Sequence, residues 1–159
     1  AGAGGLLVAA GLIGFDTLRC LAEDEQLSLP LIAHPAFLSA YATHPDGGIA
    51  HAVLYGQLPR LAGTDAVIFP NYGGRFSFAR PDCEQIIKAC GLPMGRLAPV
   101  CPVPAGGMTI ERLPEIIEAY GRDLILLVSG DLYQLSPDLC RNSRRFRDLA
   151  ESFQGSNVK

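Results

Sequence analysis

Five short apolar runs, each followed by a loop and a helical pattern, constrain the fold of this 159-residue chain more than any other feature. The runs span residues 6–10, 30–33, 66–69, 97–101 and 124–128. Short runs that are apolar throughout are typical of strands buried on both faces of a parallel sheet. Apolar residues at helical spacing predict helices over about 15–25, 49–62, from Asp82 onward, 109–121 and 137–153. The alternation predicts an α/β fold with five parallel strands.

Individual residues mark where these helices begin, bend and end. Asp82 and Gln85 are spaced as in a capping box, so we expect Asp82 to cap the third helix. Thr109 can cap the fourth helix, and Gly121 is a typical residue for its end. Pro59 lies inside the second helix and is expected to kink it.

Two architectures fit this pattern, an open doubly wound sheet and part of a (β/α)8 TIM barrel. A GxGxxG motif does not follow the first run, as a dinucleotide-binding fold would require. The Gly-rich and polar clusters follow the ends of the runs, which in a barrel form the catalytic face. A complete barrel needs about 250 residues, so we expect the last five βα units of one, over residues 1–154, with a frayed tail at 155–159. The start at Ala1, without Met, is interpreted as the start of a fragment.

Composition excludes several classes of protein. A 48% hydrophobic content argues against disorder, and a net charge of −3 without a basic stripe argues against a nucleic-acid partner. The apolar segments are too short or too interrupted to span a membrane. Five cysteines without a CxxC motif predict neither a disulfide framework nor a zinc site, which favours a reducing cytoplasmic location.

Candidate functional residues gather where the runs end. His34 can carry a proton or donate to an anion, although a histidine satisfied by neighbouring backbone is the alternative. Asn71, which we expect to contact substrate, opens a loop in which two glycines precede Arg75. This arrangement suits a mobile loop that brings positive charge to an anion, or else a surface turn with a solvated arginine.

Two further turns could bind a phosphate through backbone N–H groups. Gly106 and Gly107 follow the fourth run, and Ser129 and Gly130 follow the fifth. The last two strands of a barrel often carry such loops. Asp131 argues against this reading, because its carboxylate would repel phosphate unless it is turned aside.

Taken in order, these motifs resemble the C-terminal barrel part of the RuBisCO large-subunit superfamily, and more closely its RuBisCO-like (form IV) branch. The resemblance rests on segments 14–19 (Gly-Phe-Asp-Thr-Leu-Arg), 33–37 (Ala-His-Pro-Ala-Phe), 60–65 (Arg-Leu-Ala-Gly-Thr-Asp), 69–78 (Phe-Pro-Asn-Tyr-Gly-Gly-Arg-Phe-Ser-Phe) and 104–108 (Pro-Ala-Gly-Gly-Met). It implies a homodimer and a Mg²⁺ ion held by a carbamylated Lys, an Asp and a Glu. Those ligands would precede Ala1, so this chain is expected to contain no metal ligand and to be inactive alone.

The resemblance also implies roles for individual residues. His34 matches a histidine that faces the substrate, and Arg75 falls where the carboxylases carry the lysine of a closing loop. The phosphate-binding loops match Gly106 with Gly107, and Ser129 with Gly130.

Departures from the family pattern decide the expected reaction. Pro35 stands where true carboxylases carry an arginine for a second phosphate, Arg75 replaces a lysine, and Ala105 replaces a serine. We therefore expect a lyase or isomerase that uses Mg²⁺ to enolise, and then decarboxylate or isomerise, a phosphorylated ketose or sugar acid. The alternatives are a ribulose-1,5-bisphosphate carboxylase and a non-catalytic truncated barrel.

Overall fold

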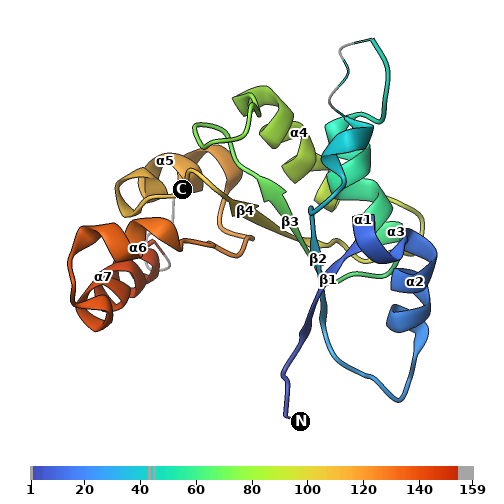
Figure 1. Ribbon diagram of the computed structural model, residues 1–159, viewed down its shortest axis with the longest axis horizontal. Coiled ribbons are helices and arrows are strands. Elements are labelled where there is room, and N and C mark those ends of the chain that lie inside the picture. The colour runs from blue at the N-terminus through green and yellow to red at the C-terminus, as the bar shows by residue number, and fades with distance from the viewer. Residues whose placement is uncertain (1, 43, 45, 154–159) are drawn as a thin grey trace.

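A parallel sheet of four strands forms the centre of the fold in the computed structural model, which describes residues 2–42, 44 and 46–153 (Figure 1). The strands are β1 (Leu6–Ala9), β2 (Leu31–His34), β3 (Ala66–Pro70) and β4 (Cys101–Ala105), and they lie side by side in this order. In the register, Ala9 pairs with His34, and Pro70 pairs with Ala105. The carboxyl ends of the strands therefore meet at one rim, which confirms the expected α/β fold.

Helices connect the strands, and the chain ends in a helical pair. The α-helices are α1 (Ala10–Ile13), α2 (Phe15–Glu23), α3 (Leu58–Leu61), α4 (Arg80–Gly91), α5 (Leu113–Tyr120), α6 (Gly130–Leu135) and α7 (Leu139–Ser152). Three helices of other types are the 3₁₀-helices η1 (Ser39–Tyr41) and η3 (Ile110–Arg112) and the π-helix η2 (Val53–Gln57). Helices α6 and α7 extend beyond the β4 side of the sheet (Figure 1).

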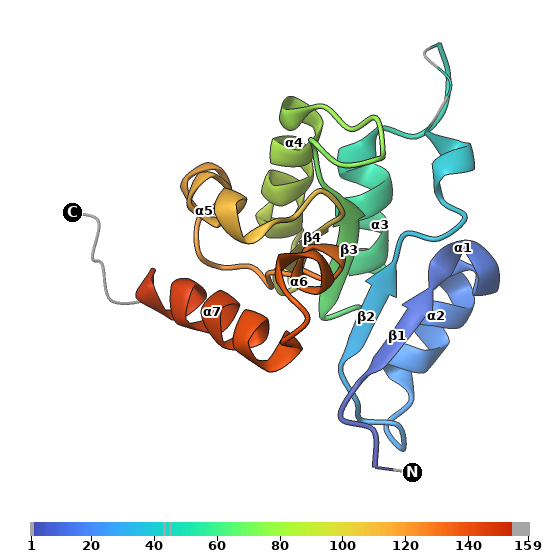
Figure 2. The same ribbon diagram turned by 60° about the vertical axis from the view of Figure 1, so that its left-hand side comes forward.

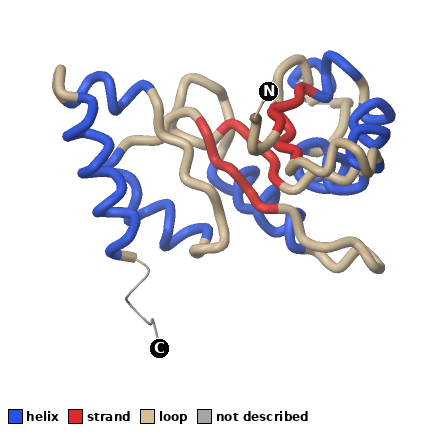
Figure 3. The backbone as a smooth tube through the Cα atoms, turned by 90° about the horizontal axis from the view of Figure 1, so that it is seen from below, coloured by secondary structure: helices blue, strands red, loops and turns tan. Residues whose placement is uncertain are grey.

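The two faces of the sheet are covered unequally. The larger core packs Leu31 and Phe69 of the sheet with Leu18, Ile86 and Ile116 of the helices, and all five side chains are fully buried. Helices α2, α3 and α4 lie along this side of the strands (Figure 2), and the strands run through the middle of the chain (Figure 3). The opposite face has only a small cluster, which is centred on Ala66, Ile68 and Val103. That small cluster faces the interior of the expected barrel.

The fourth and fifth strands differ from prediction. The fourth strand spans Cys101–Ala105, so it begins where the predicted run 97–101 ends, and it includes Pro102 and Pro104. The N–H of Cys101 donates to Asp65 on the β3 side, so the nitrogens of both prolines point to the opposite side. A proline nitrogen has no hydrogen to donate.

The fifth apolar run lies on that opposite side of β4 and forms no strand. Leu127 makes a single parallel bridge to Ala105, and the N–H of Ile125 donates to the carbonyl of Pro102 at 3.0 Å. The run can therefore donate to β4, but it receives nothing from the two prolines. The prediction of a fifth strand over 124–128 was wrong in this respect.

Local helix signals were partly correct. Pro59 lies in α3, directly after the π-helix η2, so the regular α-helical pattern is broken just before it. The expected kink at Pro59 stays a prediction. Helix α4 begins at Arg80, so Asp82 is not its cap; the Asp82 carboxylate instead accepts the N–H of Ala79 at 3.3 Å. Gly121 ends α5 with a φ of 82°, as expected.

Two other predictions concern the chain ends and membranes. The expected frayed tail, 155–159, lies outside the described residues. Within the described part of the chain, no helix combines the length and the apolar character that crossing a bilayer would need.

Candidate active site

A cleft of about 840 Å³ lies at the rim formed by the carboxyl ends of the strands. Its floor includes Ile68, Ala105 and Leu127 from the less covered face of the sheet. The predicted site residues that line it are His34, Arg75, Gly106, Gly107, Ser129 and Gly130. The segments that follow β2, β3, β4 and the fifth apolar run thus converge on one cleft.

His34 is the last residue of β2 and is half-buried at the cleft. Its Nδ1 accepts a hydrogen bond from the N–H of Ala36 at 3.1 Å. A neutral imidazole that accepts at Nδ1 carries its proton on Nε2. The local turn therefore fixes the tautomer of His34 and keeps Nε2 as the atom for exchange with a ligand.

Arg75 lies in the loop after β3, and this loop is in direct backbone contact with the loop after β4. Arg75 is exposed, and its Cζ lies 4.8 Å from the centre of the Phe76 ring. A Cβ atom at Gly74 would lie 2.7 Å from the nitrogen of Gly107, and a Cβ at Gly107 would lie 2.5 Å from the nitrogen of Gly74. Both positions therefore require glycine for this close approach.

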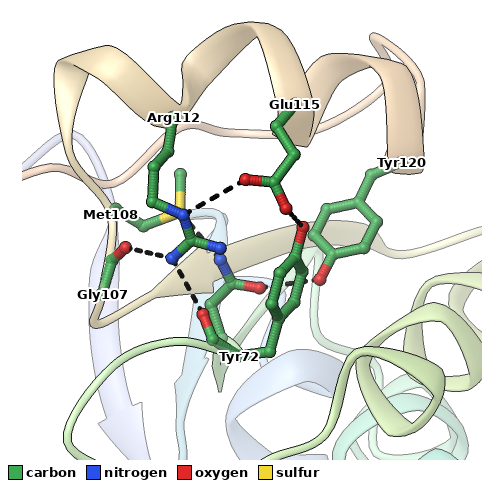
Figure 4. Close-up of polar contacts among 7 residues, drawn as sticks. Tyr72, Gly107, Met108, Arg112, Glu115 and Tyr120 are labelled. Atoms are coloured by element: carbon green, nitrogen blue, oxygen red, sulfur yellow. Dashed lines mark hydrogen bonds and ion pairs between the residues drawn. The ribbon is translucent and has the colours of Figure 1, made fainter.

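A network of polar contacts surrounds the two loops (Figure 4). The Arg112 guanidinium donates to the carbonyls of Tyr72 and Gly107, and it also contacts the Glu115 carboxylate. The Tyr72 hydroxyl donates to Glu115. The pKa of Tyr72 is raised, mainly by burial and also by this hydrogen bond to Glu115. The same bond lowers the pKa of Glu115.

Asn71 lies in the core and is absent from the lining of the cleft. It is completely buried, its Oδ1 accepts from the Tyr120 hydroxyl at 2.7 Å, and its Nδ2 points to the Met108 sulfur at 3.2 Å. Its backbone N–H donates to Ala105 at 2.8 Å. The expectation that Asn71 contacts substrate therefore has no geometric support, because these internal contacts occupy its amide.

The charge of Asp131 is directed to a backbone donor. Asp131 lines the cleft beside Ser129 and Gly130, and its Oδ2 accepts the N–H of Ile110 at 2.9 Å. Ile110 is the first residue of η3, and Thr109, which was expected to cap this helix, makes no capping bond through its side chain. Asp131 caps the helix in its place.

The described residues provide no site for a divalent cation. They include no group of three or more His, Cys, Asp or Glu side chains that could hold a metal ion. The five cysteines are free thiols, and burial raises the pKa values of Cys83, Cys90 and Cys101.

Sequence reasoning missed the parts of the site that depend on long-range contacts. Tyr55 and Phe78 line the cleft, and Arg112 joins its two loops from outside. Tyr55 and Phe78 were visible only as apolar residues. Arg112 lies at the end of η3, and from the sequence an arginine at such a place is expected to be solvated.

Comparison with known proteins relates the chain to one group. It is 36% identical over 135 residues to ribulose bisphosphate carboxylase-like protein 1 of Rhodopseudomonas palustris, covering 85% of this chain and 35% of that protein. It is 37% identical over 140 residues to 5-methylthioribulose-1-phosphate isomerase of Rhodospirillum rubrum, covering 88% and 36%. No family model matches the chain.

A solved structure shows the same relationship at the level of the fold. The RuBisCO-like protein of Alicyclobacillus acidocaldarius superposes with a TM-score of 0.88 at 32% identity, over 96% of this chain and 38% of that one. The chain thus spans about a third of the length of the relatives it matches. The four parallel strands correspond to part of the barrel of such proteins.

Proposed function

We propose that the full-length protein enolises a phosphorylated ketose or sugar acid. The reason is that this chain is homologous to the C-terminal barrel part of RuBisCO-like proteins. Isomerisation or decarboxylation of the enolised substrate would follow. The observation that carries this proposal is the convergence of His34, Arg75 and two Gly-rich loops on one cleft. The four features together match the needs of an anionic substrate whose reaction requires movement of a proton.

His34 is the proposed proton carrier. Its half-buried position and fixed tautomer present Nε2 to a ligand in the cleft. A ring nitrogen of histidine can give up a proton and recover it within one turnover. In the enolisation proposed here, Nε2 gives its proton to the substrate oxygen as a base takes the proton from the neighbouring carbon, and it recovers the proton when the carbonyl forms again.

Arg75 is the proposed partner of the negative oxygen. Its positive guanidinium can bind a carboxylate with two parallel hydrogen bonds, or donate to a single enolate oxygen. Because enolisation builds negative charge on oxygen, a cation at this rim stabilises the product of proton removal more than the ketone. The backbone N–H groups around Gly106 with Gly107, and Ser129 with Gly130, are the proposed contacts of the phosphate.

Carboxylation of a bisphosphate is not supported by the lining of the cleft. Pro35 lines the cleft without a charge that could hold a second phosphate. The family resemblance also implies a Mg²⁺ ion. The described residues do not fit such an ion, because they include no group of three His, Cys, Asp or Glu side chains that could hold it. We further propose that the full-length protein is a cytoplasmic homodimer.

Proton exchange is the direct test of the proposed function. The full-length protein is incubated in D₂O with phosphorylated ketoses or 3-oxo sugar acids, with and without Mg²⁺, and deuterium incorporation is followed by NMR. We expect incorporation next to the carbonyl of one of these substrates. Carboxylation of ribulose bisphosphate at ordinary enzymatic rates, or no exchange with any of them, would refute the proposal.

His34→Gln is the matched test of the proton carrier. We expect exchange to fall by about 10²–10⁴-fold while the melting temperature changes little, since glutamine remains polar and of similar size. His44→Gln is the control. Like His34, His44 accepts at Nδ1 the N–H of the residue two positions on, here Asp46 at 3.1 Å, but His44 does not line the cleft. A His34→Gln variant that melts earlier yet exchanges normally would assign His34 a structural role.

A further inference from the structure

We propose that Arg112 is a positioning residue that fastens the Arg75 loop to the Gly106–Gly107 loop, so that both meet the substrate as one preassembled surface. This inference rests on the proposed function for its catalytic consequence. Its structural part stands on the contacts of Arg112 alone. The resemblance to carboxylases implied a closing loop at Arg75, whereas these contacts tie that loop to its neighbour.

One nitrogen of the guanidinium bridges the two loops. Arg112 Nη1 donates to the carbonyl of Tyr72 at 2.9 Å and to the carbonyl of Gly107 at 2.6 Å. Tyr72 follows β3 and Gly107 follows β4, so these two bonds join segments that are far apart in the sequence. Two backbone carbonyls that share one charged donor cannot separate without losing a strong hydrogen bond.

The guanidinium is itself held on several sides. Its Nε lies 3.4 Å from Glu115 Oε2, and its Cζ lies 4.7 Å from the centre of the Tyr72 ring. Glu115 in turn accepts the Tyr72 hydroxyl, which closes a ring of contacts (Figure 4). A Cβ at Gly73 would lie 2.8 Å from Nη1, so the absence of a side chain there makes room for the guanidinium.

Arg112 acts on the cleft only through these loops. It is not among the residues that line the cleft, and its side chain is 22% exposed. Tyr72 lies three residues before Arg75, and Gly107 is itself part of the proposed phosphate loop. Lysine cannot replace it, because a single ammonium group does not combine stacking on a ring with a planar fork of donors.

Amide hydrogen exchange tests the fastening without any ligand. In Arg112→Lys, we expect the amides of residues 72–76 and 106–109 to exchange at least tenfold faster, while those of α4 are unchanged. Arg80→Lys is the control, because Arg80 also lies over the Tyr72 ring, at 5.9 Å, but pairs with Glu84 and bridges no loops. Unchanged loop exchange, or equally faster exchange throughout the protein, would overturn the fastening.

Kinetics of the full-length protein tests the consequence for the site. We expect kcat/KM of Arg112→Lys to fall at least tenfold at temperatures at which the variant is fully folded. Faster loop exchange with an unchanged kcat/KM would overturn the positioning role. Because hydrogen exchange requires no substrate, a wild-type protein without turnover would refute the proposed function while leaving the fastening open to direct measurement.

Discussion

Replacing Gly74 with alanine should force apart the two loops that form the rim of the cleft. The new Cβ would lie 2.7 Å from the nitrogen of Gly107 and 2.9 Å from the carbonyl carbon of Gly106, whereas ordinary contact begins at 3.4 Å. Both neighbours are backbone atoms, so no side chain can rotate away to relieve the collision. The loops must separate by several tenths of an ångström, which strains the bond from Arg112 to Gly107.

The magnitude follows from the cost of overpacking. Forcing an extra carbon into a tightly packed site costs about 1–3 kcal/mol. For a chain of this length each kcal/mol lowers the melting temperature by about 2–4 °C, so Gly74→Ala should melt about 2–12 °C earlier. The φ of Gly74 lies outside the left-handed region, so the loss is due to the collision rather than to backbone strain.

Calorimetry against a matched glycine variant measures this effect. Gly91 also has a φ outside the left-handed region, lies at the end of α4, and would bring its Cβ within 4 Å of nothing. Gly91→Ala should therefore melt at or slightly above the wild-type temperature, since alanine favours helix. If Gly74→Ala were as stable as Gly91→Ala, the close contact between the loops would be refuted.

Two other predictions concern reactivity and charge at known positions. Burial raises the pKa of Cys90 to about 12, so its thiol is protonated at pH 8. In the folded protein an aromatic disulfide reagent should label the exposed Cys20 and Cys140 first, and Cys90 only after denaturation. Rapid labelling of Cys90 in the folded protein would contradict its burial. The Asp131→Asn variant should bind inorganic phosphate several-fold more tightly, as measured by titration calorimetry. The amide oxygen can still accept the Ile110 N–H, while the negative charge that repels the anion is removed. Equal affinity would show that this charge does not repel the bound phosphate.

Local periodicity was sufficient to predict much of the fold. The first three strands and the helices α2 and α5 lie close to where apolar spacing put them. The fourth strand was misplaced because Pro102 and Pro104 are residues typical of loops. In β4 the backbone N and C=O groups of successive residues alternate in direction, so both proline nitrogens point away from β3. Helix α6 was not predicted, because six residues give too few turns for a helical period to be visible.

The site was predictable to the extent that it follows from topology. Carboxyl ends of parallel strands share a rim, and this rule alone brings His34 and Gly106 to one cleft. The burial of Asn71 could not be foreseen, because it depends on a tyrosine and a methionine that are distant in the sequence. The same holds for Arg112, whose role is visible only when the two loops are seen together (Figure 4).

The prolines of β4 also change how the segment beside that strand is held. Since β4 offers carbonyls but no proline N–H to residues 124–128, few backbone hydrogen bonds join that segment to the sheet. Apolar side chains hold it instead, because Leu124, Leu126 and Val128 pack against the larger core and Leu127 packs against the small cluster. We therefore expect the backbone of this edge to open more often than the backbone of β2 and β3, while its side chains remain part of the same packed unit.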